Sequence, residues 1–124
     1  MPIPASPVVL VLAGGVVSQA AICRTAELAA GAPVTVIGTG AESEQPRRAV
    51  ALAMSALQDA GVAAFGQVSV TASPGRSVAR LARARGARVV VLDRCRVPDP
   101  AFAAELRRRM YGSGITVLTP AERP

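Results

Sequence analysis

Five short apolar runs alternate with four helical patterns along this chain, and that alternation restricts its possible folds more than any other feature. Strands that alternate with helices form parallel sheets with right-handed crossovers and with helices on both faces. The chain is therefore predicted to fold as one small, doubly wound α/β domain around a five-stranded parallel sheet. The predicted strands are Val8–Ala13, Val34–Ile37, Gln67–Thr71, Arg88–Leu92 and Ile115–Leu118.

The composition of each run indicates where its strand lies in the sheet. Val8–Ala13 and Arg88–Leu92 are almost continuously apolar, which is typical of strands buried on both faces. Gln67–Thr71 instead alternates polar and apolar residues, which indicates an edge or half-buried strand.

The helices are located by their caps and by the spacing of their apolar residues. Ser18 is predicted to cap the first helix, and Pro46 is predicted to be the first residue of the second. The third and fourth helices are predicted to begin at Ser73-Pro74 and at Asp99-Pro100. The residues predicted to face inward from these last two helices are Val78, Leu81, Ala82, Phe102, Ala103, Leu106 and Met110.

A single domain is predicted over residues 8–119, between a loose N-terminal tail of residues 1–7 and a C-terminal tail of residues 120–124. The apolar segment Val8–Val17 is too short to cross a bilayer, no basic residue precedes it, and Gly14-Gly15 interrupt it. We therefore expect a cytoplasmic protein that does not associate with membranes.

The absence of whole residue types excludes several classes of enzyme. The chain has no His and no Lys, so all 14 of its positive side chains are Arg. A His general base, a Ser-His-Asp triad, a Lys Schiff base and a Walker lysine are thereby excluded. Two Cys without His do not supply the usual zinc ligands, so we expect no metal site. Cys23 and Cys95 are predicted to be free thiols, and the flanking Arg94 and Arg96 are a possible cause of reactivity at Cys95.

The formal net charge of +6 is compatible with acidic or phosphate-bearing partners. The alternative is codon bias in a GC-rich genome combined with solvated helix faces. Arg76, Arg80 and Arg83 recur on one helical face, which is typical of the solvent side of an amphipathic helix. Because no aromatic residue accompanies them for base stacking, nucleic acid is not an expected partner.

Three segments of the chain together resemble the universal stress protein family. Val70–Val78 resembles the family's strand followed by a small residue and a proline that open a helix. Ala82–Leu92, in which Gly86-Ala87-Arg88 stands for the family's Gly-Ala-Asp, resembles the entry into its fourth strand. Gly114–Leu118 resembles its closing strand. The resemblance implies the strand order 3-2-1-4-5, helices on both faces of the sheet, and a role in stress response.

The chain departs from the nucleotide-binding members of that family in two places. Those members carry an Asp at the end of the first strand, where this chain has Ala13 or Gly14. They also carry a glycine-rich phosphate-binding motif after the fourth strand, where this chain has Val97-Pro98-Asp99-Pro100 and no glycine before Gly112. The resemblance is therefore to the branch that lacks the ATP-binding motif, and we expect no cofactor. An adenine nucleotide in a degenerate site stays open as an alternative.

Any small ligand is expected at the carboxyl ends of the first and fourth strands, where open α/β sheets bind their ligands. The candidate ligand-binding residues are Gly14, Gly15, Ser18, Gly38, Asp93 and Arg94. Each also has a structural explanation, because glycines form tight turns, Ser18 caps a helix, and Asp93 and Arg94 can pair or cap the local backbone.

The expected function is that of a non-enzymatic, universal-stress-protein-like protein that acts in stress response through dimerisation and protein contacts. The last strand would lie at the edge of the sheet, where an unpaired strand invites pairing with a second copy. The predicted homodimer interface consists of Ile115, Thr116, Val117 and Leu118. Two alternatives stay open: a degenerate adenine-nucleotide sensor, and a docking subunit of a larger complex.

Overall fold

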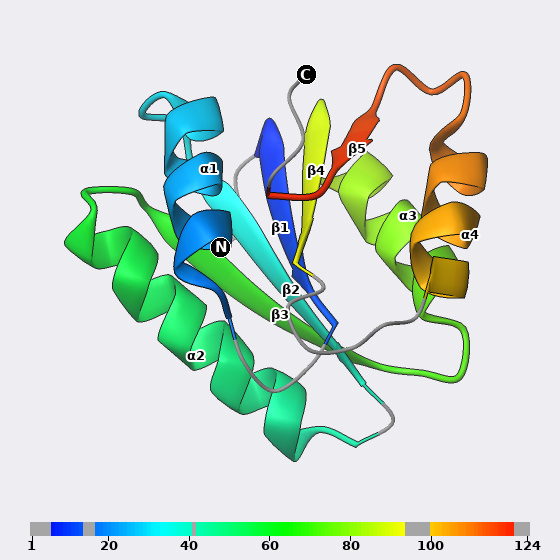
Figure 1. Ribbon diagram of the computed structural model, residues 1–124, viewed down its shortest axis with the longest axis horizontal. Helices are drawn as coiled ribbons and strands as arrows, with labels where there is room; N and C mark the ends of the chain where they lie inside the picture. Colours follow the sequence, from blue (N-terminus) through cyan, green and yellow to red (C-terminus); the bar gives the residue numbers. More distant parts are fainter. Residues whose placement is uncertain (1–5, 14–16, 41, 94–99, 121–124) are drawn as a thin grey trace.

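The structure is a computed structural model that describes residues 6–13, 17–40, 42–93 and 100–120, and it has the predicted alternation of strands and helices (Figure 1). The five parallel strands lie in the order β3-β2-β1-β4-β5, which confirms the predicted doubly wound α/β fold. The elements are β1 (Val8–Leu12), α1 (Gln19–Ala29), β2 (Val34–Gly40), α2 (Glu44–Asp59), β3 (Ala64–Val70), α3 (Pro74–Ala84), β4 (Val89–Asp93), α4 (Pro100–Met110) and β5 (Thr116–Leu118).

The sheet separates two hydrophobic clusters, one on each face. Helices α1 and α2 cover one face and α3 and α4 cover the other (Figure 1). Along β1, Val8, Leu10 and Leu12 contribute to the cluster under α1 and α2. Val9 and Val11 contribute to the opposite cluster, because successive side chains of a strand point to opposite faces. All five residues of β1 are at most 2% exposed, as a strand buried on both faces requires.

The two edge strands differ in length and in exposure. Along β3 the exposed fraction alternates, with Val68 at 37% and Val70 at 50%, which confirms the predicted edge strand. At the other edge, β5 has three residues and pairs only with β4 among the described strands. The predicted inner face of α4 is also confirmed, since Phe102, Ala103, Leu106 and Met110 are buried.

Three elements have a boundary that differs from the sequence prediction by two or more residues. Strand β3 begins at Ala64, three residues before the predicted Gln67. Strand β2 continues to Gly40, because Gly38, Thr39 and Gly40 pair with the second half of β3 instead of forming a loop. Helix α2 begins at Glu44, so Pro46 is its third residue and not its first. A proline is tolerated there because the first four amides of a helix have no intrahelical acceptor.

The predicted N-terminal tail is wrong at residues 6 and 7, which belong to the folded domain. Ser6 is fully buried; its amide donates to Arg85 O at 2.8 Å, and its hydroxyl lies 2.9 Å from that of Thr35. The Pro7 carbonyl accepts the amides of Arg88 and Val89. These bonds extend the sheet beyond β1, and the rest of the predicted tail lies outside the described residues. Among the described helices, none is both long and apolar enough to cross a membrane.

Candidate functional site

The strand register brings two of the predicted ligand-binding residues to the same edge of the sheet. Leu12, the last residue of β1, pairs with Gly38 of β2 on one side and with Asp93 of β4 on the other. Ser18 joins this group through a hydrogen bond to Asp93. Gly14, Gly15 and Arg94, which were predicted to contribute to the same site, lie outside the described residues. The candidate site is therefore built here from Ser18, Gly38 and Asp93.

Asp93 forms the polar centre of this edge. Its side chain is at the end of β4, the residue is 4% exposed, and its Oδ2 accepts the Ser18 amide at 2.7 Å. The hydroxyl of Ser18 in turn accepts the amide of Ala21 at 3.1 Å, so the predicted N-cap of α1 is confirmed. The Asp93 carboxylate thus lies at the positive end of the α1 dipole, where a negative charge is stabilised.

Gly38 has a packing role at this edge. A Cβ atom at residue 38 would lie 2.7 Å from the carbonyl oxygen of Pro46 and 2.7 Å from Cγ2 of Val50. Because both atoms belong to α2, the glycine lets that helix approach β2 closely. The missing side chain therefore leaves space that the protein's own helix fills, and this space is not open to a ligand.

Thr39 is a further polar residue at these strand ends, and it lies beyond the predicted strand Val34–Ile37. It is 5% exposed, and its Oγ1 donates to the Leu12 carbonyl at 3.4 Å. The bond joins the ends of β2 and β1. Its only signal in the sequence is a β-branched residue between two glycines, a pattern that also occurs in turns.

Among the described residues, the predicted interface strand pairs with a neighbouring strand on one side only. Ile115 precedes β5, whereas Thr116, Val117 and Leu118 form it. The Thr116 amide donates to Arg88 O at 2.9 Å, on the β4 side. Because neighbouring residues of a strand direct their amides to opposite edges, the Val117 amide is directed to the open edge. A depression of about 340 Å³ borders this edge, and Tyr111, which is 92% exposed, contributes to it.

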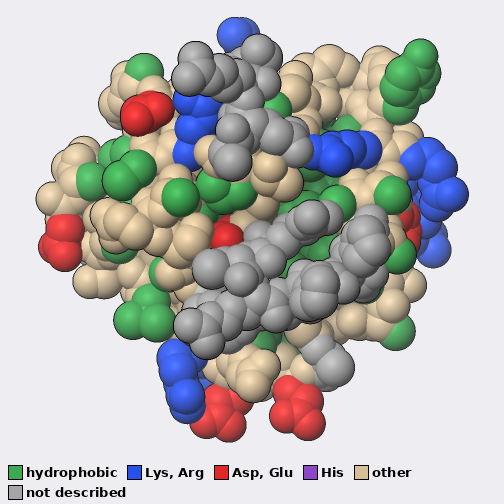
Figure 2. All heavy atoms as spheres, viewed as in Figure 1, with side chains coloured by type: hydrophobic (Ala, Val, Ile, Leu, Met, Phe, Trp, Pro, Cys, Tyr) green, Lys and Arg blue, Asp and Glu red, His purple; other side chains and the backbone are tan. Residues whose placement is uncertain are grey.

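Several charged residues have partners within the chain. Figure 2 shows one face of the molecule, on which arginine and acidic side chains are interspersed with hydrophobic ones. Arg83 of α3 donates to the carbonyl of Arg109, and Arg85, the C-cap residue of α3, donates to the Gln67 side chain at 3.2 Å. The predicted stripe of Arg76, Arg80 and Arg83 therefore does not act as a unit, since Arg83 is engaged with α4.

The cysteines and acidic residues give no metal-binding cluster in the part of the chain that the structure describes. Cys23 is a free, exposed thiol on α1, and the Gln19 side chain donates to its sulfur at 3.6 Å. Cys95 and its flanking arginines lie outside the described residues.

The arrangement of strands and helices defines a class: the protein has a universal-stress-protein-like fold. A solved structure of a universal stress protein from Archaeoglobus fulgidus matches it with a TM-score of 0.73, covering 94% of this chain and 93% of that chain at 18% sequence identity. No protein-family model and no curated protein matches the chain. The fold that the sequence resemblance implied is thereby confirmed.

Proposed function

We propose that this protein is a non-enzymatic, universal-stress-protein-like protein of the cytoplasm that acts in stress response as a homodimer and through contacts with other proteins. The observation that carries the proposal is the hydrogen bond between Asp93 and the Ser18 amide, 2.7 Å long, at the strand ends where such folds take up small ligands. An anion at these strand ends would bind at the N-terminus of α1, where free backbone amides can donate hydrogen bonds. Here the protein's own carboxylate occupies that position.

The groups at the ends of β1 and β4 do not suit the phosphates of a nucleotide. A phosphate that approached the N-terminus of α1 would come close to the buried Asp93 carboxylate. Two negative charges in contact repel each other. The space beside Gly38 is filled by α2. The degenerate nucleotide sensor is therefore the weaker of the alternatives, and a role through protein contacts is favoured.

The homodimer is supported by the geometry of β5. Its outer edge offers the Val117 amide and carbonyl, and a two-fold axis through this edge would pair the same residues of two copies. A second candidate function, a docking subunit in a larger complex, is favoured by the other edge strand, where Val68 and Val70 are exposed.

Calorimetry with Mg-ATP tests the absence of nucleotide binding. We expect no saturable heat below about millimolar ligand, which corresponds to a binding free energy of about 4 kcal/mol. A micromolar dissociation constant would contradict the proposal. The matched variant Asp93→Asn keeps an oxygen acceptor but removes the charge, so weak binding that emerges only in this variant would identify the carboxylate as the group that excludes the anion.

A further inference from the structure

A second polar pocket lies between the end of β3 and the first turns of α3, away from the carboxyl ends of β1 and β4. It has a volume of about 430 Å³ and is lined by Thr71, Ser73, Arg76, Ser77 and Arg80. Strands β2 and β1 separate β3 from β4 in the sheet, so this pocket is distinct from the site around Asp93. Every lining residue carries a hydroxyl or a guanidinium group.

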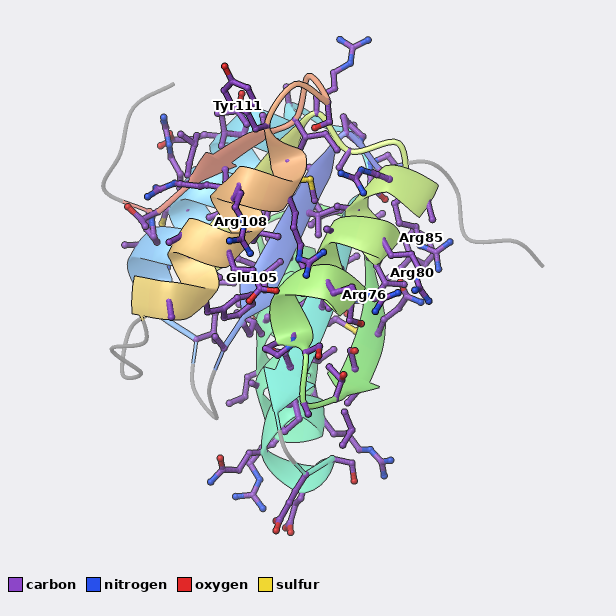
Figure 3. The ribbon with its side chains drawn as sticks, turned by 90° about the vertical axis from the view of Figure 1, so that its right-hand side faces the viewer. Arg76, Arg80, Arg85, Glu105, Arg108 and Tyr111 are labelled. Carbon is purple, nitrogen blue, oxygen red and sulfur yellow. The ribbon has the colours of Figure 1, made fainter. Side chains whose placement is uncertain are left out.

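The two arginines of the pocket are not neutralised by the chain. Arg76 and Arg80 are one helical turn apart, both are exposed, and neither forms an ion pair with a residue that the structure describes. Figure 3 shows them on the side of α3 that borders β3, away from Glu105. Glu105 itself pairs with Arg109 at 3.0 Å. The pocket therefore has two positive charges and no acidic lining residue.

The hydroxyl groups and the helix end add further hydrogen-bond donors. Ser73 is the N-cap residue of α3, yet its side chain makes no capping hydrogen bond. The Ser77 hydroxyl lies 2.6 Å from that of Ser69, and the Thr71 hydroxyl accepts the Ser73 amide at 3.0 Å, so the walls of the pocket are held in place. The first turn of α3 contains no acidic residue of its own, and the Glu105 carboxylate of α4, which lies against Gly75 there, is paired with Arg109. The positive end of the α3 dipole therefore adds to the two guanidinium charges.

We propose that this pocket binds a phosphoryl group, either as free phosphate or on a phosphorylated serine or threonine side chain. The Arg76 and Arg80 guanidinium groups would donate charge-assisted hydrogen bonds to its oxygens, with Ser73 and Ser77 as hydroxyl donors. A tetrahedral dianion offers enough acceptors for both guanidinium forks at once, whereas one carboxylate satisfies a single fork. No aromatic residue lines the pocket, which disfavours a nucleic-acid strand.

The test is a titration of the ¹⁵N-labelled full chain with inorganic phosphate at constant ionic strength, followed by NMR. We expect saturable shifts at the amides of residues 71–80. The double variant Arg76→Gln, Arg80→Gln should bind at least about tenfold more weakly, the loss expected for charge-assisted hydrogen bonds. The matched control Arg47→Gln, Arg48→Gln removes the same charge from two exposed arginines of α2 and should bind like the unmodified chain.

Further arms identify the source of the phosphoryl group and the outcomes that overturn the proposal. Tighter binding of O-phosphoserine than of phosphate would assign a phosphorylated side chain, and equal binding would assign free phosphate. If the glutamine variant does not fold, the double variant Arg76→Lys, Arg80→Lys is used instead. It keeps both positive charges but lacks the forked guanidinium groups, so it should still bind phosphate more weakly. Three results would overturn the proposal. The Arg47, Arg48 control could lose as much phosphate affinity as the Arg76, Arg80 variant, or the shifts could rise linearly without saturation. The third is stronger binding of oligothymidylate than of phosphate at these amides.

Discussion

The substitution Asp93→Ala removes the carboxylate that accepts the Ser18 amide at 2.7 Å, in a residue that is 4% exposed. A hydrogen bond to a charged group contributes about 1.5–3 kcal/mol, and a carboxylate at a helix N-terminus adds about 0.3–1 kcal/mol. We therefore expect a loss of about 2–4 kcal/mol in the free energy of unfolding. In a domain of this size the melting temperature should fall by about 10 °C.

Urea and thermal denaturation followed by circular dichroism measure this effect. Asp93→Asn keeps an oxygen acceptor without the charge, so its loss should be about half as large. Glu42→Ala removes an exposed carboxylate and should change stability by no more than about 0.5 kcal/mol. If Asp93→Ala is as stable as Glu42→Ala, the carboxylate does not hold α1 against β4 and the interpretation of this edge is refuted.

Two further substitutions test the packing around the site. Gly38→Ala places a methyl group 2.7 Å from the Pro46 carbonyl oxygen and from Val50, so we expect a loss of about 1–3 kcal/mol in urea denaturation, whereas an unchanged midpoint would mean that α2 does not pack there. Val90→Ala, at a fully buried residue of β4, should cost about 1–3 kcal/mol as lost burial and a cavity, and a silent substitution would contradict its central position.

The sequence predicts most of this fold because its hydrophobic periods are unambiguous. Strands β1 and β4 are continuous apolar runs, and the alternation along β3 correctly identifies an edge. The failures occur where local propensity is overridden by pairing. Gly38 and Gly40 suggest a loop, yet β3 supplies partners for both residues. The prolines near Ser6 suggest a loose tail, yet Arg85 and Arg88 bind its backbone.

The sequence predicts where the candidate site lies, but not which of its residues bond to each other. The rule that ligands bind at strand carboxyl ends brings Asp93 and Ser18 to one edge, but no pattern states that they bond to each other. The pocket beside β3 was harder to predict. Its arginines were visible as a helical stripe, but the sequence does not show that Arg83 turns to α4 while Arg76 and Arg80 border the hydroxyls of Ser73 and Ser77. Such side-chain choices depend on tertiary neighbours.

Sedimentation velocity of the unmodified protein tests the proposed homodimer most directly. At roughly 50 µM, well above a micromolar Kd, we expect a species of twice the chain mass of 12.6 kDa. Val117→Pro removes the outward amide from both copies and should yield monomer or aggregate. Leu52→Ala alters an exposed side chain of α2, outside the predicted interface, and should leave the dimer intact. A single 12.6 kDa monomer of the unmodified chain under these conditions would contradict the dimer and would favour a subunit whose β5 edge is covered by a different protein.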